Sequence, residues 1–248
     1  MAVNNKRQTE QVNCISKPIK VACFSYGLNS VAGLCELGID YFDEIMFADP
    51  GAEEQETYLY IDYIRKIKPD WFKKIRRVTS KYGNIFQYYF KKKTYPSMFK
   101  RDCTPKFKII PIKKDLESRY PKGTMFEMHI FYTYDEIGRM FKTNEKPPKG
   151  QIMIYPLIDR KITREMCKQI VEDSGMLEPV KSGCFFCFFK SKEQWLKLKQ
   201  SNPTQFKKVL ELEKRAGMRK KEFALVKLKA KEQFSTLDTC GCQMDRSN

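Results

Sequence analysis

Short apolar runs alternate with amphipathic segments in the first third of the chain. Residues 19–24 (IKVACF) and 44–48 (EIMFA) are apolar runs that end in turn-forming residues. Buried parallel strands have this character, so we predict strands there and at residues 75–79. Between them, apolar residues at i, i+3, i+4 spacing predict one helix that ends at Gly38 and a second that carries Ile64.

This order of elements predicts the fold. Strand, helix, strand, helix, strand at this pitch is typical of an α/β protein with a parallel twisted sheet and helices on both faces. Further strands are expected at residues 124–132 and 151–155, and helices at 135–141 and 163–174. Such sheets bind ligands beyond the carboxyl ends of their strands, which directs attention to the loops that follow the first two strands.

The last third of the chain is expected to be mainly helical. Ser191 and Gln194 form a capping-box pattern, and Asn202 begins another helix. The predicted organisation is an α/β nucleotide-binding domain over residues 15–190, followed by a helical extension over 191–248 that carries a cysteine-containing tail.

Hydropathy and cysteine usage narrow the class of protein. No apolar run approaches the roughly 18 to 20 residues that cross a bilayer, and the polar start of the chain lacks the apolar core of a signal peptide. We therefore expect a soluble, cytoplasmic protein without a membrane partner. In a reducing compartment, nine cysteines are more often metal ligands or reactive groups than disulfide partners.

The charge is strongly basic and unevenly distributed. The formal net charge is +17, from 47 Lys and Arg against 30 Asp and Glu. Residues 65–101 contain thirteen basic residues and one acid, Asp70, interleaved with aromatic side chains. This mixture is typical of a surface that binds tRNA or DNA. It also fits a solvated basic helix face whose aromatic side chains point into the core, and the sequence leaves both interpretations open.

The loop after the first strand is the first candidate site. There, backbone N–H groups, hydroxyls and a helix N-terminus would favour a phosphate or a sulfate. A glycine at a strand-to-helix turn also occurs in ordinary packing. The candidate ligand-binding residues of this loop are Ser25, Tyr26, Gly27, Leu28, Asn29 and Ser30.

A second candidate site is a pair of cysteines late in the chain. Cys184 and Cys187 form a C-x-x-C pair, a spacing that lets two thiolates reach one metal ion or cluster. His129 is the one histidine, and it falls inside an expected strand. Metal sites built from histidines and Ser-His-Asp catalysis are therefore not expected.

Four ordered segments resemble one known family. Residues 24–30 (FSYGLNS), 47–58 (FADPG through ETY), 101–112 (RDCTPKFKIIPI) and 155–159 (YPLID) resemble motifs of the sulfonucleotide (PAPS/APS) reductases. These enzymes belong to the adenine nucleotide alpha-hydrolase and ATP pyrophosphatase superfamily, and the chain also looks like reductase-like proteins of phages. The resemblance covers residues 21–190.

The resemblance implies an adenine nucleotide, either ATP, APS or PAPS, at the loop of residues 25–30, with Asp49 near the adenosine and Gly51 beside it. Mg²⁺ is a further candidate. It also makes Arg139 a candidate ligand of the sulfonucleotide anion, although an exposed helix with a Glu/Arg pair would explain the same residues. The implied activity is sulfonucleotide reduction, with thioredoxin as electron donor.

The resemblance also implies an iron–sulfur cluster of the 4Fe–4S type, held by Cys103 with Cys184 and Cys187. Only three of four ligands are then present, so Cys240 or Cys242 would complete the set, or one iron would stay open. Structural zinc and the absence of any metal are the alternatives. Residues 239–243 (TCGCQ) resemble the family's tail, in which a cysteine attacks the sulfonucleotide. This makes Cys240 the candidate nucleophile and Cys242 a second candidate catalytic residue.

Two other functions fit the same features. An ATP-dependent sulfurtransferase that modifies tRNA or DNA would explain the basic charge and the three-thiolate site. A non-catalytic nucleic-acid-binding protein that keeps the nucleotide fold and a structural zinc would explain Tyr26 and Leu28, which replace a glycine and a variable residue of the related phosphate loops. Sequence alone leaves these alternatives open.

Overall fold

A parallel sheet forms the centre of the protein. A computed structural model describes residues 17–96, 101–144 and 148–217. Its sheet has five strands in the order β3-β2-β1-β4-β5, and every pairing is parallel. The strands are β1 Ile19–Phe24, β2 Glu44–Asp49, β3 Ile75–Thr79, β4 Phe126–His129 and β5 Gln151–Ile154. The predicted α/β class with a helical C-terminal part is therefore confirmed.

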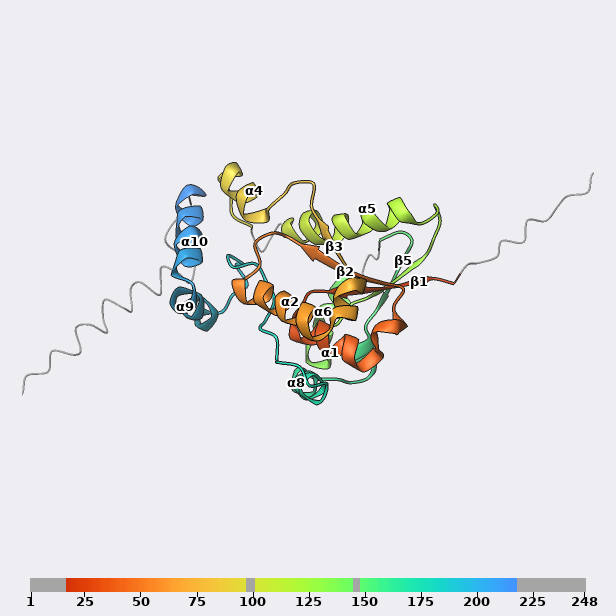
Figure 1. Ribbon diagram of the computed structural model, residues 1–248. Helices are drawn as coiled ribbons and strands as arrows, with labels where there is room; N and C mark the ends of the chain where they lie inside the picture. Colours follow the sequence, from red (N-terminus) through yellow and green to blue (C-terminus); the bar gives the residue numbers. More distant parts are fainter. Residues whose placement is uncertain (1–16, 97–100, 145–147, 218–248) are drawn as a thin grey trace, which may run out of the picture.

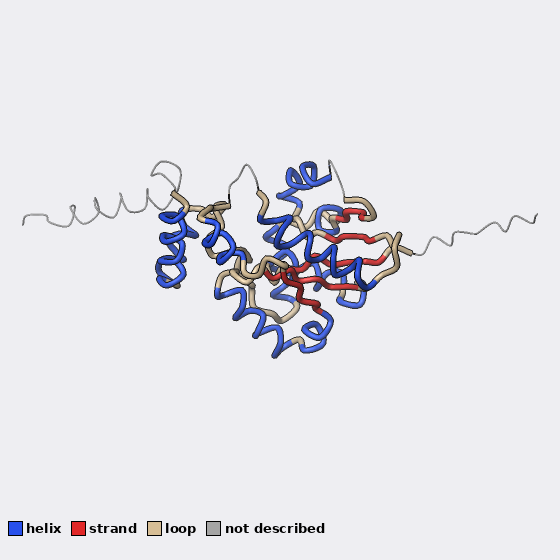
Figure 2. Tube along the Cα trace, turned by 90° about the horizontal axis from the view of Figure 1, so that it is seen from above, coloured by secondary structure: helices blue, strands red, loops and turns tan. Residues whose placement is uncertain are grey.

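Helices cover both faces of this sheet (Figure 1). One face carries α1 Leu28–Leu37, α2 Gln55–Ile67 and α8 Arg164–Asp173, and the other carries α5 Ile110–Arg119, which continues from a short π-helix, η2 Pro105–Ile109. Figure 2 looks onto the sheet from above, so that its strands lie side by side. The remaining elements are η1 Ile39–Tyr41, α3 Pro69–Lys74, α4 Ile85–Lys92, η3 Tyr134–Glu136, α6 Ile137–Asn144, α7 Pro156–Asp159, α9 Lys192–Ser201 and α10 Pro203–Arg215.

The strand β1 is buried on both sides, as its apolar run predicts. Ala22 and Phe24 face the core shared with α1 and α8, while Val21 and Cys23 face the core under α5. Alternate residues of a strand point to opposite faces, so a continuous apolar run is what a doubly covered strand requires.

A second core lies beside the sheet, around the C-x-x-C turn. Here α10 packs against both α9 and α4 (Figure 1). Phe107, Phe186 and Trp195 are almost completely buried there, together with residues of α10. Side chains from both sides of residue 190 share this core. The division into domains at that residue stays a prediction.

Two helices begin where the sequence predicts, and one strand is shorter than predicted. Ser191 and Gln194 form the predicted capping box, and Asn202 caps α10. The strand expected over residues 124–132 is shorter, because the chain turns after His129 to close a Tyr132-to-Ile130 hydrogen bond of 3.0 Å.

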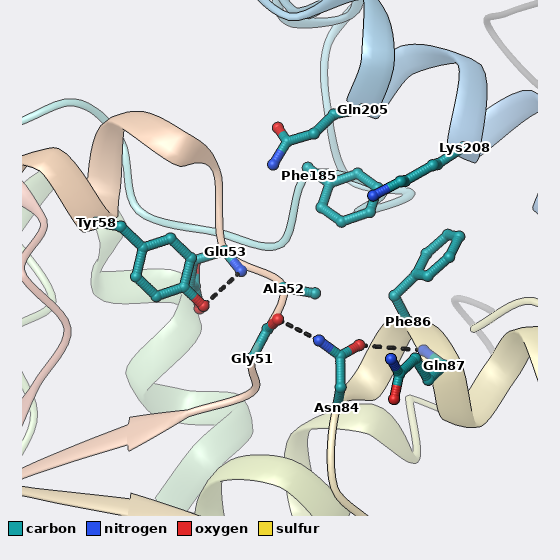
Figure 3. A pocket seen from close by; sticks show the side chains of 10 residues that line it. All are labelled: Gly51, Ala52, Glu53, Tyr58, Asn84, Phe86, Gln87, Phe185, Gln205 and Lys208. Atoms are coloured by element: carbon teal, nitrogen blue, oxygen red, sulfur yellow. Dashed lines mark hydrogen bonds between the residues drawn. The ribbon is translucent and has the colours of Figure 1, made fainter.

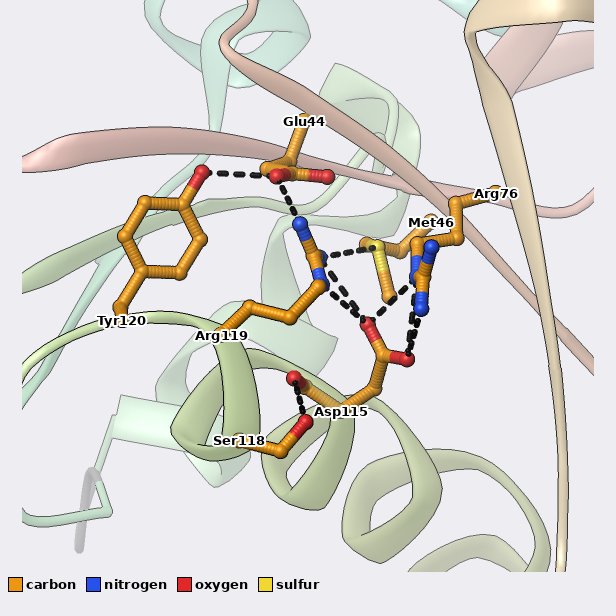
Figure 4. Close-up of polar contacts among 7 residues, drawn as sticks. All are labelled: Glu44, Met46, Arg76, Asp115, Ser118, Arg119 and Tyr120. Atoms are coloured by element: carbon orange, nitrogen blue, oxygen red, sulfur yellow. Dashed lines mark hydrogen bonds and ion pairs between the residues drawn. The ribbon is translucent and has the colours of Figure 1, made fainter.

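The carboxyl end of α5 is tied to the sheet by a network of charges (Figure 4). Arg119 pairs with Glu44 at the start of β2 and with Asp115, 2.9 Å away. Asp115 also accepts from Arg76 of β3 at 2.8 Å, and the Tyr120 hydroxyl donates to Glu44 at 2.7 Å. Arg119 of α5 thus reaches Glu44 of β2, and Arg76 of β3 reaches Asp115 of α5, which fixes α5 against β2 and β3.

Candidate functional site

The loop between β1 and α1 has an unusual backbone. Tyr26 has φ of 55°, a left-handed conformation that favours glycine. Its ring is buried between Phe24 and Phe47, at centroid distances of 4.6 and 4.9 Å, and burial raises its pKa. The side chain of Leu28 is also buried. Both side chains therefore belong to the core, and what they offer a ligand is backbone.

Three hydroxyls converge on this loop. The Oγ atoms of Ser25 and Ser30 lie 3.2 Å apart, and Ser182 donates to Ser25 Oγ at 3.2 Å. The approach is so close that a Cβ on Gly27 would lie 2.5 Å from Ser182 Oγ, which explains the glycine. Hydroxyls at a helix N-terminus are suited to an oxyanion. Local sequence signals do not single out Ser182, because it lies 157 residues from Ser25 along the chain and only the tertiary fold brings it to this loop.

Asn29 and Arg139 belong to a polar network beside the loop. Asn29 donates to Glu136 at 3.0 Å and accepts from Arg164 at 3.3 Å. Arg139 pairs with Glu136 and lies over the ring of Tyr132, 4.1 Å from its centroid. The carboxylate of Glu136 therefore holds Asn29 at the loop and Arg139 at the cavity described below.

Asp49 is a buried carboxylate at the end of β2. Its Oδ1 accepts from the backbone of Gly51 at 2.7 Å and from the Tyr58 hydroxyl at 3.0 Å, while its Oδ2 pairs with Arg77. Burial, followed by the charge of Asp49, raises the pKa of Tyr58. Asp49 thus anchors the loop after β2, where Gly51 turns with φ of 74°.

A cavity of about 490 Å³ opens between the carboxyl ends of the strands and α5. Apolar side chains of the sheet and of α5 form its walls, and Ser25 connects it with the hydroxyl cluster. Ligand sites commonly combine such apolar walls with a few charged groups. The cations are Arg101, Lys108 and Arg139, and the apolar walls include Cys23, Phe24, Ala48, Ile109, Ile112, Met128, Ile130 and Met153.

The C-x-x-C turn is fastened to the loop after β2. Glu53 and Cys184 form an antiparallel bridge, and the backbone of Glu54 donates to Gly183 at 3.0 Å. The side chain of Glu54 also pairs with Lys190, whose own side chain is 5% exposed. These contacts bring residues far apart in sequence to the same edge of the sheet.

Lys108 connects the cavity with the cysteine turn. It lines the cavity, and its ammonium lies 3.2 Å from the carboxylate of Glu53, which is 1% exposed. The Glu53 charge raises the pKa of Lys108, so the lysine stays protonated. The second carboxylate oxygen of Glu53 is buried without a hydrogen-bond partner among the described residues. Sequence reasoning did not single out Lys108, although it lies five residues after Cys103.

The three predicted metal ligands lie in one region. Cys103 and Cys184 are partly buried against the second core, Cys187 is also partly buried, and all three are free thiols. Burial raises the pKa of Cys184 well above its usual range, and the charges of Glu53 and of the other two thiols add to the increase. Within residues 17–96, 101–144 and 148–217, no three His, Cys, Asp or Glu side chains are close enough to hold a metal ion. The thiols suit iron or zinc chemically, but they are not gathered to bonding distance.

A smaller cavity of about 210 Å³ lies behind the loop after β2 (Figure 3). The carboxamide of Asn84 donates to the carbonyl of Gly51 and accepts from the Gln87 backbone at 3.1 Å. Gln205 and Lys208 of α10 face it from the other side. Gly51 therefore lines this smaller cavity.

The predicted site residues thus separate into groups. Ser25 and Arg139 line the large cavity, while Ser30 and Asn29 support the loop beside it. Cys240 and Cys242 lie outside the described residues. No helix in the described part of the chain combines the length and apolar character that a bilayer crossing requires. Compared with known proteins, the chain matches no family model and no curated protein sequence.

Proposed function

We propose that this protein is an enzyme that binds an adenine sulfonucleotide, APS or PAPS, in the large cavity and reduces it. The observation that carries the proposal is the position of Lys108. The ammonium group of Lys108 lines a nucleotide-sized cavity and also contacts the carboxylate of Glu53. The backbone of Glu53 in turn forms a β-bridge with Cys184 of the C-x-x-C turn. Nucleotide binding and thiol chemistry would therefore take place side by side.

The cavity offers suitable groups for each part of such a ligand. The adenine ring fits the apolar space between Met128, Met153 and Ile112. The negatively charged end would lie at the hydroxyls of Ser25 and Ser182, where the amino end of α1 adds positive potential.

Cations at the mouth neutralise the sulfonate. Lys108 and Arg139 are each held by a carboxylate, and Arg101 lies over the ring of Phe189, 5.1 Å from its centroid. Held in place in this way, they lose little freedom when the anion binds, which favours transition-state stabilisation. Their charge also makes the sulfur more susceptible to a thiolate.

The chemical step assigned to the tail is a displacement at sulfur. The thiolate of Cys240 attacks the sulfur, an S–S bond forms, and the S–O bond to the nucleotide breaks with the electron pair leaving on the phosphate. A dithiol protein such as thioredoxin then reduces the thiosulfonate, becomes a disulfide and releases sulfite. Cys103, Cys184, Cys187 and a tail cysteine would hold a 4Fe–4S cluster, which would fix the cysteine turn beside the cavity when bound.

The test is a single anaerobic incubation. Purified protein receives sulfur-labelled APS or PAPS with a dithiol reductant, and labelled sulfite is the expected product. Cys184→Ser should abolish both sulfite release and the broad visible absorbance of a cluster. Cys35→Ser, a partly buried thiol of the first core, should keep both. Failure of both sulfonucleotides to yield sulfite refutes the reductase proposal.

A second candidate is an ATP-dependent sulfurtransferase that acts on tRNA or DNA. It is favoured by a basic groove on the other flank of α5, which Arg77, Lys81 and Lys114 line. In the same incubation, this activity would release AMP or pyrophosphate from ATP only when nucleic acid is added. Stoichiometric zinc without colour and without either reaction would instead favour a binding protein with structural zinc.

A further inference from the structure

Another hollow, the basic groove, lies on the flank of α5 opposite the large cavity. It has a volume of about 490 Å³ and runs between the end of β3 and the start of α5. The hydroxyl of Ser80 donates to the Lys106 carbonyl at 2.8 Å and so fixes the strand end against η2. The large cavity is lined by Ile109 and Ile112, whereas the basic groove is lined by Ile110 and Lys114. One helix therefore separates two sites.

The walls of the basic groove carry an excess of positive charge. Lys81 and Lys114 are exposed and have no carboxylate partner among the described residues. Arg77 also lines it, 62% exposed although it pairs with Asp49. The carboxylate in the wall, Asp115, is already bonded to Arg76 and Arg119. The net field in the basic groove therefore attracts a polyanion.

Aromatic rings accompany these cations. Most described aromatic side chains of residues 65–96 pack inward, as one of the two sequence interpretations expects. Tyr82 differs, because it is 42% exposed in the wall of the basic groove. Its neighbour Tyr88, 5.3 Å away between ring centroids, has Lys92 4.7 Å and Lys106 5.5 Å from its own ring centroid. These ammonium groups, Lys92 first, lower the pKa of Tyr88.

We infer that the basic groove binds a single-stranded nucleic acid, with phosphates at Lys81 and Lys114 and a base stacked on Tyr82. Lysines that track a backbone beside an exposed ring are the usual features of single-strand recognition. A rigid duplex offers no unstacked base to such a ring, and an acidic peptide offers no flat face. The inference does not depend on which reaction the neighbouring cavity performs.

The position of the basic groove suggests why a nucleic-acid strand would bind here. Arg77 joins it to Asp49, which anchors the loop after β2. A strand lying in the basic groove would therefore pass close to the carboxyl edge of the sheet, where the nucleotide cavity and the cysteine turn also lie. Binding of the strand and of the nucleotide can then be measured separately, since α5 keeps the two ligands apart.

The experiment is fluorescence anisotropy with labelled oligothymidine and oligouridine of equal length, at several salt concentrations. Lys81→Glu with Lys114→Glu should weaken binding about tenfold or more and reduce the slope of log K against log salt by about 1.4. The matched control, Lys66→Glu with Lys122→Glu, reverses two exposed lysines elsewhere and should retain most of the affinity. Tyr82→Ala should weaken binding about tenfold, and Tyr82→Phe should restore it.

Three outcomes would overturn the inference. Equal losses in the control and groove pairs would mean that diffuse charge alone binds the strand. Competition by polyglutamate as effective as by the unlabelled oligonucleotide, with no effect of Tyr82→Ala, would mean a general polyanion surface. Tighter binding of a duplex would exclude single-strand recognition. Thermal melts of each variant, matched to the unmodified protein, establish that the changes act on binding, and tighter binding of oligouridine than of oligothymidine identifies RNA as the preferred strand.

Discussion

The two ends of helix α5 use charge differently. At its carboxyl end, Arg119 and Arg76 are paired with Glu44 and Asp115 in a closed network that ties three elements together (Figure 4). At its amino end, Lys108 belongs to a pair that also faces a cavity, and the elements beside it add Arg101 and Arg139.

The difference separates structural charge from charge available to a ligand. A network in which two arginines join carboxylates of two different elements contributes to the position of the helix. A cation that is held from one side while its other side faces an apolar cavity can meet an anion at small entropic cost. Changes at the carboxyl end should therefore alter stability, and changes at the amino end should also alter ligand binding.

The largest effect is expected at the pair between Lys108 and Glu53. Lys108→Met leaves a carboxylate that is 1% exposed without its cation. This should lower the free energy of unfolding by about 3–5 kcal/mol, measured by denaturant titration. Adding Glu53→Gln should recover most of that loss, because the uncompensated charge is removed. A double variant that remains as unstable as Lys108→Met would show that the pair does not have this role.

The next effect concerns acid stability at His129, on the face of the sheet opposite α5. Its ring packs against Tyr41 and Phe42, and burial, followed by the charge of Lys20, lowers its pKa to about 4. The unfolded chain takes up this proton near pH 6.5, so stability is complete above that pH and decreases as pH falls toward 4. The loss should reach about 3 kcal/mol.

His129→Phe should flatten the curve of unfolding free energy against pH between 6.5 and 4. An unchanged slope in this variant would assign the acid sensitivity to other groups.

The same pH titration separates the contribution of His129 from that of the charge network at the carboxyl end of α5. Hydrogen bonds from Arg76 and Arg119 outweigh burial and lower the pKa of Asp115, so its contribution is lost only below pH 3.8, its ordinary value.

A somewhat smaller effect is expected for Asp115→Ala. Removing a carboxylate bonded to two arginines should lower the free energy of unfolding by about 2 kcal/mol. Affinity for an adenine nucleotide should stay within about twofold, since the network lies at the far end of α5. A large loss of nucleotide affinity in a folded Asp115→Ala protein would contradict the division between the two ends.

The smallest effect is expected for Arg101→Ala at the mouth of the cavity. Among the described residues it contacts a ring, Phe189, and no carboxylate, so its removal leaves no buried charge. Stability should be nearly unchanged, while affinity for APS or PAPS should fall about tenfold. Arg65→Ala, an exposed arginine of α2 paired with Asp62, is the matched control. Equal affinity of both variants would remove Arg101 from the site.

Sequence patterns predicted the elements whose burial is uniform. Residues 19–24 and 75–79 form strands with the predicted bounds, and Ser191 caps α9 as expected. Helices α4 and α5 were not predicted, because basic and aromatic residues obscure their apolar faces and α5 follows a π-helix. Such patterns report local periodicity, which a change of helix type interrupts.

The candidate site was only partly accessible to sequence reasoning. Ser25 and Arg139 follow strands, and the carboxyl edge of a parallel sheet is where ligands bind. Ser182 and Glu53 reach the site through a crossing of the chain that no short-range pattern encodes. The inward turn of the Tyr26 ring likewise depends on Phe47, a neighbour on the adjacent strand.

The most direct test of the proposal that an adenine nucleotide binds in the large cavity is calorimetric titration. APS, PAPS and ATP are titrated into the unmodified protein and into two variants of β5. Met153→Trp places a bulky ring in the cavity, whereas Ile152→Trp adds the same bulk at a position that is 41% exposed on the opposite side of the strand. We expect saturable binding of an adenine nucleotide by the unmodified protein and by Ile152→Trp, and a loss of at least about tenfold in Met153→Trp. Unchanged affinity in a folded Met153→Trp protein, or no saturable heat from any of the three nucleotides, would contradict the account.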